Sequence, residues 1–301
     1  MVIERTAQTG AIQKIYPLDR PLLEQEVRVS FTPAEDPEAM LDREYNRYSE
    51  MKNAKGEPGV YIPHWRELIL VFKGLSPNVN LSGLELEVAT SFHSQALRRG
   101  CVEDITPATV LGITRTSDDK IMYGVRGGTA APGAATALVL GQANTIPGGH
   151  VTPQTTYSPN VIFSSFFDEL LGEGGIERKQ TSECSLIGYQ TDPQFKSLCF
   201  AMRTQTSFSS QELAEMHTRA LEVYQKAKTS GAPELEARKR IGEAGMVNSD
   251  AWENNSLIFL PNDPRYLKKI VESGHIEHED RRYKTLDNSI GALVMHLHSA
   301  R

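Results

Sequence analysis

The stretch Ile146–Ile176 constrains the fold most, because it joins a glycine turn to a helix with one apolar side. A Pro-Gly-Gly turn opens this stretch. Apolar residues then recur every four positions, at Ile162, Phe166 and Leu170. That spacing predicts an amphipathic helix whose apolar side packs on a core. The glycine pair Gly174-Gly175 predicts where the helix ends.

The other side of this helix carries two acidic residues. Glu169 and Glu173 are four positions apart, so their side chains project from neighbouring turns of one face, which Ser165 and Gly172 share. Two carboxylates opposite a glycine turn, where the backbone can approach closely, predict a site for a hard divalent cation that keeps some of its waters. The alternative is a solvated helix face without a ligand, which is the usual reason for such a pair.

The turn and the helix together resemble the signature of the Nudix hydrolases, enzymes that cleave pyrophosphate linkages. That signature has a glycine before the helix, glutamates within it, and a glycine with an aliphatic residue after it. The matching residues are Gly149, Glu169, Leu170, Glu173, Gly175 and Ile176. The resemblance implies that Glu169, Glu173 and the backbone carbonyl of Gly149 bind Mg²⁺, with Mn²⁺ as the alternative ion.

Three positions depart from that signature. Thr155 stands where the first glutamate belongs, Asp168 replaces the arginine that steadies the carboxylates, and Gly172 replaces the middle glutamate. The spacer between Thr155 and Asp168 is also five residues longer than in the signature. These departures leave two functions open: a metal-dependent hydrolase with weakened metal affinity, and a Nudix-fold nucleotide-binding or sensor protein that is catalytically impaired.

A wider pattern resembles the animal branch of this superfamily that hydrolyses UDP-glucose and UDP-galactose. The segments that carry it are Pro147–His150, Pro153-Gln154, Phe163–Ser165, Ala251–Asn254 and Leu257–Phe259. They cover the last two thirds of the chain well and the first third only in outline. The resemblance implies hydrolysis of a nucleoside diphosphate linked to another moiety, with a nucleotide sugar or ADP-ribose as the substrate.

Three residues outside the helix complete the site that the resemblance implies. Glu253, which precedes a predicted strand, is one candidate for the general base, and Glu173 is the other. Arg126 is expected to meet a substrate phosphate, and an ordinary surface ion pair is the alternative. His150 is expected to contact the substrate, and a buried, hydrogen-bonded histidine is the alternative.

The order of the elements indicates the α/β class, and the resemblance implies a Nudix α/β/α sandwich. Residues 1–100 are predicted to form an N-terminal α+β lobe. Residues 101–301 are predicted to form the Nudix-like catalytic domain, with a helical insertion over residues 209–243. The lobe or the insertion is expected to cover the site and choose the substrate. The alternative for the lobe is an extension of the core or a dimer interface, so a homodimer stays open.

Periodicity and turn residues place the remaining elements along the chain. The predicted strands are Val27–Phe31, Glu67–Lys73, Leu81–Val88, Thr109–Thr116, Lys120–Arg126, Ala137–Gly141, Cys184–Gln190, Gln194–Thr204 and Ser256–Leu260. The predicted helices besides the acidic one are Ala34–Lys55, Phe208–Lys228, Glu234–Glu243, Asn262–Ser273 and Leu286–His298.

Composition narrows the partners and the compartment. The formal net charge is −6 and no long basic run occurs, so nucleic acid and membrane surfaces are not indicated. A nucleotide-type small molecule is the expected partner. Three widely spaced cysteines indicate free thiols in a reducing compartment. The first residues contain no apolar signal core, and no apolar run is long enough to span a bilayer. We therefore expect a cytoplasmic protein.

Overall fold

Strands and helices alternate along most of the chain in the computed structural model, which describes residues 1–49, 66–73, 79–98, 100–127 and 139–299. The strands are β1 Ile3–Thr6, β2 Ile12–Leu22, β3 Val29–Phe31, β4 Leu68–Lys73, β5 Leu84–Thr90, β6 Ile105–Arg115, β7 Lys120–Arg126, β8 Ala143–Thr145, β9 Gly148–His150, β10 Thr181–Asp192, β11 Ser197–Thr206, β12 Asn254–Pro261, β13 His275–His278 and β14 Arg281–Lys284. The α-helices are α1 Pro37–Ser49, α2 Ser91–Arg98, α4 Val161–Gly174, α5 Ser210–Thr229, α6 Glu234–Glu243, α7 Pro264–Ser273 and α8 Asp287–Ser299. Short 3₁₀ turns are η1 Glu24–Glu26, η3 Arg178–Gln180 and η4 Ala251–Glu253.

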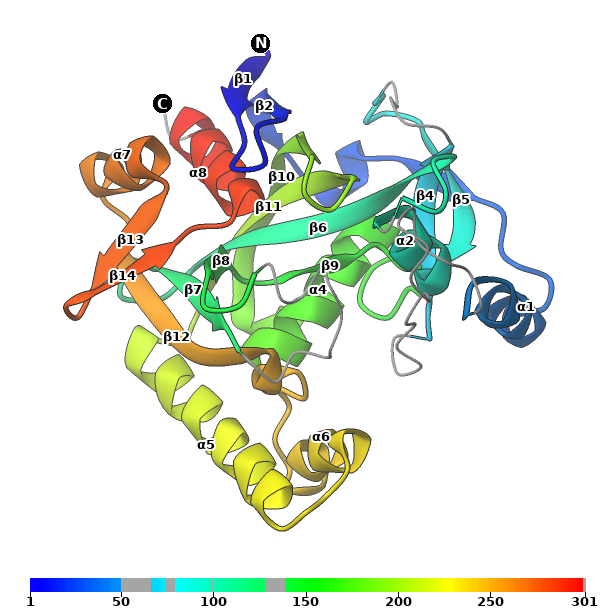
Figure 1. The fold of residues 1–301 in the computed structure, drawn as a ribbon. Coiled ribbons are helices and arrows are strands. Elements are labelled where there is room, and N and C mark those ends of the chain that lie inside the picture. The colour runs from blue at the N-terminus through cyan, green and yellow to red at the C-terminus, as the bar shows by residue number, and fades with distance from the viewer. Residues whose placement is uncertain (50–65, 74–78, 99, 128–138, 300–301) are drawn as a thin grey trace.

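Twelve of these strands join one mixed sheet, which is built around a parallel pair. β11 runs parallel to β6 and antiparallel to β10. β2 and β1 continue the sheet beyond β10, whereas β4, β5 and β3 continue it beyond β6. Strands from the first hundred residues therefore lie at both ends of the sheet (Figure 1). The division of the chain at residue 100 stays a prediction.

A branch of the sheet brings the glycine turn to its centre. The predicted hairpin of β6 and β7 is joined at Arg115 and Ile121, and β7 then pairs with β12 and β8 instead. This leaves an edge of β6 open, and β9 pairs with it from Thr109 to Leu111. The turn that carries Gly149 is thus fixed beside a central strand.

Side chains of β11 alternate between two cores, one on each face of the sheet. Phe200 and Met202 belong to the core that contains the apolar side of α4, including Phe166. Ala201 belongs to the other core, which contains Leu293 of α8. Helices therefore cover both faces of the sheet, and the predicted α/β/α arrangement is confirmed.

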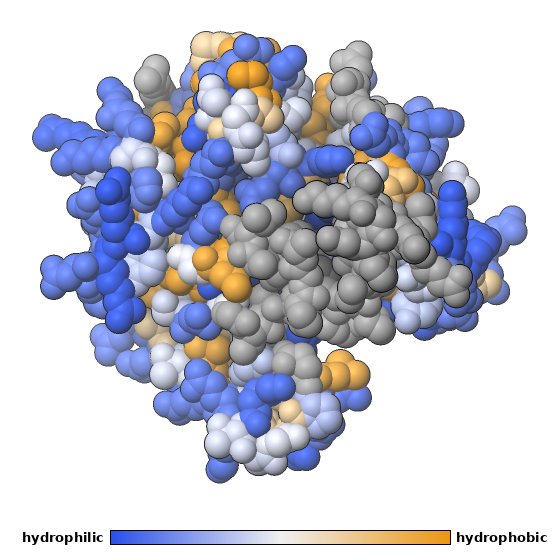
Figure 2. Space-filling model, in the orientation of Figure 1, coloured by the Kyte–Doolittle hydropathy of each residue, from blue (hydrophilic) through white to orange (hydrophobic). Residues whose placement is uncertain are grey.

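The predicted helical pair is present as α5 and α6, which project from one side of the molecule (Figure 1). Tyr224, Ala237 and Ile241 pack with Trp252 of η4, the turn that precedes β12. In the view of Figure 2, the surface is mainly hydrophilic and its hydrophobic residues form small separate patches. Among the described helices, none combines the length and the apolar composition needed to cross a bilayer.

One predicted strand is wrong in its described part. Val139–Gly141 form a turn, and the strand is β8, which begins at Ala143. Gly141 has a φ of +71° and donates its N–H to the carbonyl of Arg126 at 2.9 Å, so the chain reverses before it pairs with β7. The strands β1 and β2, the helix α2 and the hairpin β13–β14 were not predicted.

Candidate functional site

Local contacts fix both ends of α4, which carries the two predicted glutamates. Asn160 caps its start, where the side-chain Oδ1 accepts a hydrogen bond from the N–H of Ile162 at 3.1 Å. Gly175 has a φ of 71° in the left-handed region and closes the last turn with its N–H. The prediction of this helix is confirmed, and it places Glu169 and Glu173 on adjacent turns.

The glycine turn meets the carboxylate of Glu169 directly. A Cβ atom at Gly149 of β9 would lie 1.7 Å from Glu169 Oε1, so no side chain fits there while Glu169 keeps its place. One residue earlier, the N–H of Gly148 donates to Glu173 Oε2 at 3.2 Å. The structure therefore brings together Gly149, Glu169 and Glu173, as their spacing in the sequence suggested.

The acidic side of α4 faces the protein interior rather than solvent. The Glu173 side chain is 1% exposed, and Arg126 Nη2 lies 3.4 Å from its Oε1. That oxygen accepts no hydrogen bond within the described residues. Arg126 also forms an ion pair with Glu253 of η4. The alternative of a solvated helix face is wrong for Glu173, because η4 packs against α4 on this side.

Burial and mutual repulsion raise the pKa values of these carboxyl groups. Burial raises the pKa of Glu169 well above its usual range, and the charges of Glu173 and Glu253 add to the shift. Burial likewise raises the pKa of Glu173, although Arg126 acts in the opposite direction. Burial alone would lower the pKa of Arg126, but Glu253 and Glu173 outweigh it and raise that pKa. A cluster with so little positive charge favours the uptake of a proton or a cation.

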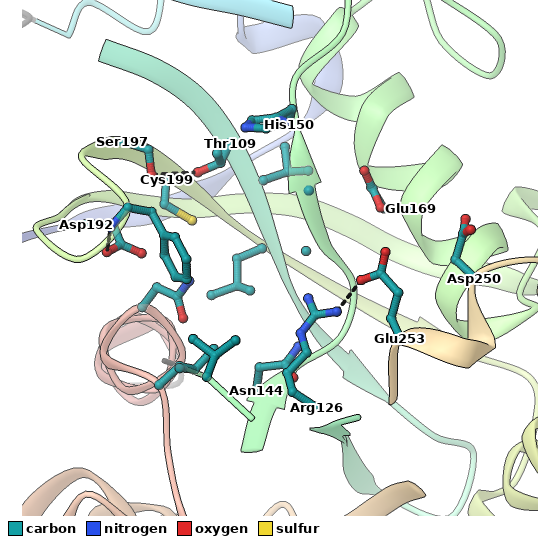
Figure 3. Close-up of a pocket in the computed structure, with 18 of the residues that line it drawn as sticks. Thr109, Arg126, Asn144, His150, Glu169, Asp192, Ser197, Cys199, Asp250 and Glu253 are labelled. Carbon is teal, nitrogen blue, oxygen red and sulfur yellow. Dashed lines mark hydrogen bonds and ion pairs between the residues drawn. The ribbon is translucent and has the colours of Figure 1, made fainter. Parts of the chain in front are cut away.

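A further carboxylate, which the sequence did not indicate, lies beside the same helix. Asp250 precedes η4 and donates its N–H to the carbonyl of Gly172 at 2.9 Å. Its Oδ2 lies 2.5 Å from the place that a Cβ atom of residue 172 would take. Burial raises the pKa of Asp250, and the charge of Glu253 adds to the shift. In Figure 3, Asp250 lies at the same end of a cavity as Glu169 and Glu253.

The cavity has a volume of about 360 Å³ and two chemically different ends. Opposite Glu169, Asp250 and Glu253, it is lined by Asp192, Ser197 and Cys199, where β10 ends and β11 begins (Figure 3). Asp192 Oδ1 accepts a hydrogen bond from the N–H of Phe195 at 3.0 Å. Burial nevertheless raises the pKa of Asp192 to about 6. This end offers polar groups for hydrogen bonding and an aromatic ring beside them.

Residues from the first hundred line the same cavity. Arg98, at the end of α2, places Nη2 3.0 Å from His150 Nε2, and His150 Nδ1 lies 3.2 Å from Glu67 Oε1. In the described part of the chain, no carboxylate forms an ion pair with Arg98, and its Nε–H has no hydrogen-bond partner. Arg98 was not predicted, because a lone arginine at the end of a helix carries no pattern.

Arg126 and His150 line the cavity and make specific contacts there. Arg126 is 17% exposed and is engaged by two glutamates, so it is not an ordinary surface pair. His150 is hydrogen-bonded at both ring nitrogens, but its side chain is 16% exposed and lines the cavity, so its expected contact with a substrate stays a prediction. Asp168 does not line the cavity. Within the described residues, no group of three or more His, Cys, Asp and Glu side chains is arranged as a metal-binding shell.

Comparisons with known proteins give only distant likenesses. No family model matches the chain, and no curated protein matches it. Among solved structures, DR0079 from Deinococcus radiodurans is 12% identical, with 56% of this chain and 74% of that chain covered and a TM-score of 0.32. The MutT protein from Methanosarcina mazei Go1 is 11% identical, with 64% of this chain and 92% of that chain covered and a TM-score of 0.32. Tm1382, a proposed Nudix hydrolase, is 11% identical, with 77% of this chain and 100% of that chain covered and a TM-score of 0.33. Scores of this size do not assign the chain to a family.

Proposed function

We propose that this chain is a divalent-metal-dependent hydrolase that cleaves the pyrophosphate bond of a nucleoside diphosphate linked to another moiety. A nucleotide sugar such as UDP-glucose is the expected substrate. The observation that carries the proposal is the contact between Glu169 and Gly149 at one end of the cavity, together with the burial of Glu173 on the next turn of α4. The resemblance of the turn and the helix to the Nudix signature supports the same reaction class.

Mg²⁺, or Mn²⁺ in its place, fits the residues present. Glu169, Glu173 and the carbonyl of Gly149 would hold it, and all three offer the oxygen ligands that hard divalent cations prefer. Glu173 Oε1 is buried without a hydrogen bond, which leaves an acceptor unsatisfied by the described protein. When bound, the ion supplies positive charge at the phosphate oxygens and lowers the pKa of a coordinated water.

Glu253 is the better placed of the two candidate bases. Its side chain is 26% exposed and lines the cavity, whereas that of Glu173 is 1% exposed. Glu253 would accept a proton from the attacking water, and Arg126 would hold the carboxylate in position through their ion pair. Arg126 thereby acts on the base rather than on a phosphate.

Arg98 is the cation best placed to bind a substrate phosphate. It lines the cavity, and His150 contacts one end of its guanidinium while the Nε–H lacks a partner. Arginine binds phosphate oxygens through charge-assisted hydrogen bonds, so a guanidinium that lines the cavity and forms no ion pair with a described carboxylate suits a diphosphate. Asp192, Ser197 and Asn288 would then hydrogen-bond the hydroxyl groups of a sugar or the edge of a base.

The second candidate function is a nucleotide-binding or sensor protein without turnover. Two observations favour it: Gly172 provides no carboxylate from the helix, and Arg126 already engages Glu253 and Glu173. Both reduce the number of carboxylates free to hold a cation. Such a protein would use the same cavity and the same nucleotide ligand.

Phosphate release from a panel of nucleotide sugars and ADP-ribose, coupled to a phosphatase, tests the proposal over a range of Mg²⁺ and Mn²⁺ concentrations. We expect turnover only with a divalent ion, and none in the double variant Glu169→Gln/Glu173→Gln. Calorimetric binding of these compounds without turnover would instead favour the sensor. Neither binding nor turnover would refute both functions.

A further inference from the structure

We infer that Asp250 supplies to the proposed metal site the carboxylate that α4 lacks at Gly172. The inference rests on the proposed function, because it requires a divalent cation at Glu169 and Glu173. Its basis is a close contact between two residues that are far apart in the sequence.

Asp250 occupies the space that a side chain at position 172 would need. A Cβ atom on Gly172 would lie 2.5 Å from Asp250 Oδ2, 3.5 Å from Cγ and 3.7 Å from Cβ. The shortest distance is to the carboxylate oxygen, so the head group itself takes this place. Position 172 lies three residues after Glu169 and next to Glu173. A carboxylate in this space is therefore beside both of them.

Contacts within and around η4 hold Asp250 in this position. Its N–H donates to the carbonyl of Gly172 at 2.9 Å, which fixes the start of η4 against α4. Ser249 Oγ donates to Oδ2 at 3.3 Å, and Trp252 Nε1–H donates to Oδ1 at 3.4 Å. Both side-chain hydrogen bonds are long, so the carboxylate keeps acceptor capacity for a cation.

The charge of the cluster favours a cation over a purely structural aspartate. Arg126 forms ion pairs with Glu173 and Glu253, whereas neither Asp250 nor Glu169 forms one within the described residues. Glu173 Oε1 is also buried there without a hydrogen bond. A glutamate in place of Gly172 would add another carboxylate to space that Asp250 already fills. The two positions therefore exclude each other, and one carboxylate from either of them serves the site.

Titration of the whole chain with Mn²⁺, measured by electron paramagnetic resonance and calorimetry without substrate, tests the inference. Asp250→Asn keeps the shape of the side chain and should weaken Mn²⁺ affinity roughly tenfold or more. Gly172→Glu should also weaken it, because the new side chain displaces Asp250. The double variant Gly172→Glu/Asp250→Ala should bind Mn²⁺ more tightly than either Gly172→Glu or Asp250→Asn. The matched control Asp168→Asn, on α4 but outside the cavity, should bind like the unmodified chain.

Equal Mn²⁺ affinity of Asp250→Asn and the unmodified chain would overturn the inference. So would a folded double variant that binds no more tightly than Gly172→Glu. Asp250→Asn alone decides the question if the variants at position 172 do not fold by circular dichroism. An unmodified chain that binds Mn²⁺ through Asp250 but hydrolyses no nucleotide sugar would refute the proposed enzyme and leave the inference standing. Absence of Mn²⁺ binding by the unmodified chain would overturn both.

Discussion

The missing side chain of Gly149 determines where Glu169 lies. A Cβ atom at this position would fall 1.7 Å from Glu169 Oε1, and the backbone of Gly149 is not in the left-handed region. We therefore expect Gly149→Ala to fold, to displace Glu169 and to weaken Mn²⁺ affinity by roughly ten- to a hundredfold. Calorimetric titration with Mn²⁺ measures this change.

Gly242 provides the matched control for that substitution. It lies in α6, and no atom lies within 4 Å of the place that a Cβ atom would take, so an added methyl group meets nothing. Gly242→Ala should leave Mn²⁺ affinity unchanged and stabilise the helix by up to about 1 kcal/mol. Unchanged Mn²⁺ binding in Gly149→Ala would remove Glu169 from the ligand set.

Glu173 is expected to destabilise the metal-free protein as pH rises. Its pKa is about 8 in the folded chain, against an ordinary value of 4.5, because the carboxyl group is buried. Between these values, the unfolded chain loses a proton that the folded chain keeps, so the free energy of unfolding falls with rising pH. Glu173→Gln does not titrate and should flatten this part of the profile. Urea unfolding without metal near pH 5 and near pH 8 measures the difference.

Glu173→Gln and Glu169→Gln should each abolish or severely reduce metal-dependent hydrolysis. The stability of Glu173→Gln near pH 8 should be at least that of the unmodified chain, because a buried charge has been removed. Full hydrolytic activity in both variants would refute their assignment as ligands. A less stable Glu173→Gln near pH 8 would contradict the linkage argument.

The site residues that could be predicted are those whose positions follow from local geometry. Helical spacing places Glu169 and Glu173 together, and a glycine turn next to the helix in sequence suggested Gly149. Asp250 and Arg98 were not predicted, because each reaches the cavity through tertiary contacts that no periodic pattern encodes. The burial of the acidic face was missed for the same reason, since it depends on η4 packing against α4.

At the scale of elements, helices with their own start and stop signals were the best predicted. Ser209 and Glu212 form the capping box of α5, and α6 has the predicted bounds Glu234–Glu243. β2 was missed because Pro17, Pro21 and several charged residues interrupt its apolar alternation. Its pairing with β10 is a tertiary interaction, and the local sequence alone does not favour a strand.

His217 joins α5 to β12 and should make this contact sensitive to acid. Its Nε2 lies 3.0 Å from the carbonyl oxygen of Asn254, so this nitrogen carries the proton and donates it. Burial lowers the pKa of His217 to about 4 from 6.5. Below about pH 6.5, His217 of the unfolded chain binds a proton that His217 of the folded chain does not bind. The contribution to stability that is present above about pH 6.5 is therefore lost as the pH falls toward 4. The expected loss is on the order of 2 to 3 kcal/mol.

Unfolding free energies of the unmodified chain and His217→Gln between about pH 7 and pH 4 measure this loss. Glutamine can donate a hydrogen bond to the same carbonyl without titrating, so its profile should be flatter. His296, whose pKa burial also lowers to about 4, is present in both proteins and cancels in the difference. Parallel profiles would show that His217 does not set the acid sensitivity.

At the scale of the whole molecule, the first hundred residues take part in both the sheet and the cavity. β2 pairs with β10 and β4 pairs with β6, while Glu67 and Arg98 line the cavity. Local patterns in the sequence indicate a separate lobe, because they do not reveal which distant strands pair. Its expected role in substrate choice remains a proposal, which the position of Arg98 supports.

We predict that a chain of residues 101–301 alone will not fold into a soluble protein. The deletion removes β2 from its pairing with β10 and β4 from its pairing with β6, and it removes Leu70, Leu84 and Leu86 from the core under α4. Unpaired strand edges beside exposed apolar surface promote aggregation. The soluble fraction after expression and the cooperativity of thermal unfolding measure the outcome. Co-expression with residues 1–100 should restore solubility, because the lost contacts between the fragments are noncovalent. A soluble 101–301 chain with unchanged Mn²⁺ affinity would instead establish the division at residue 100.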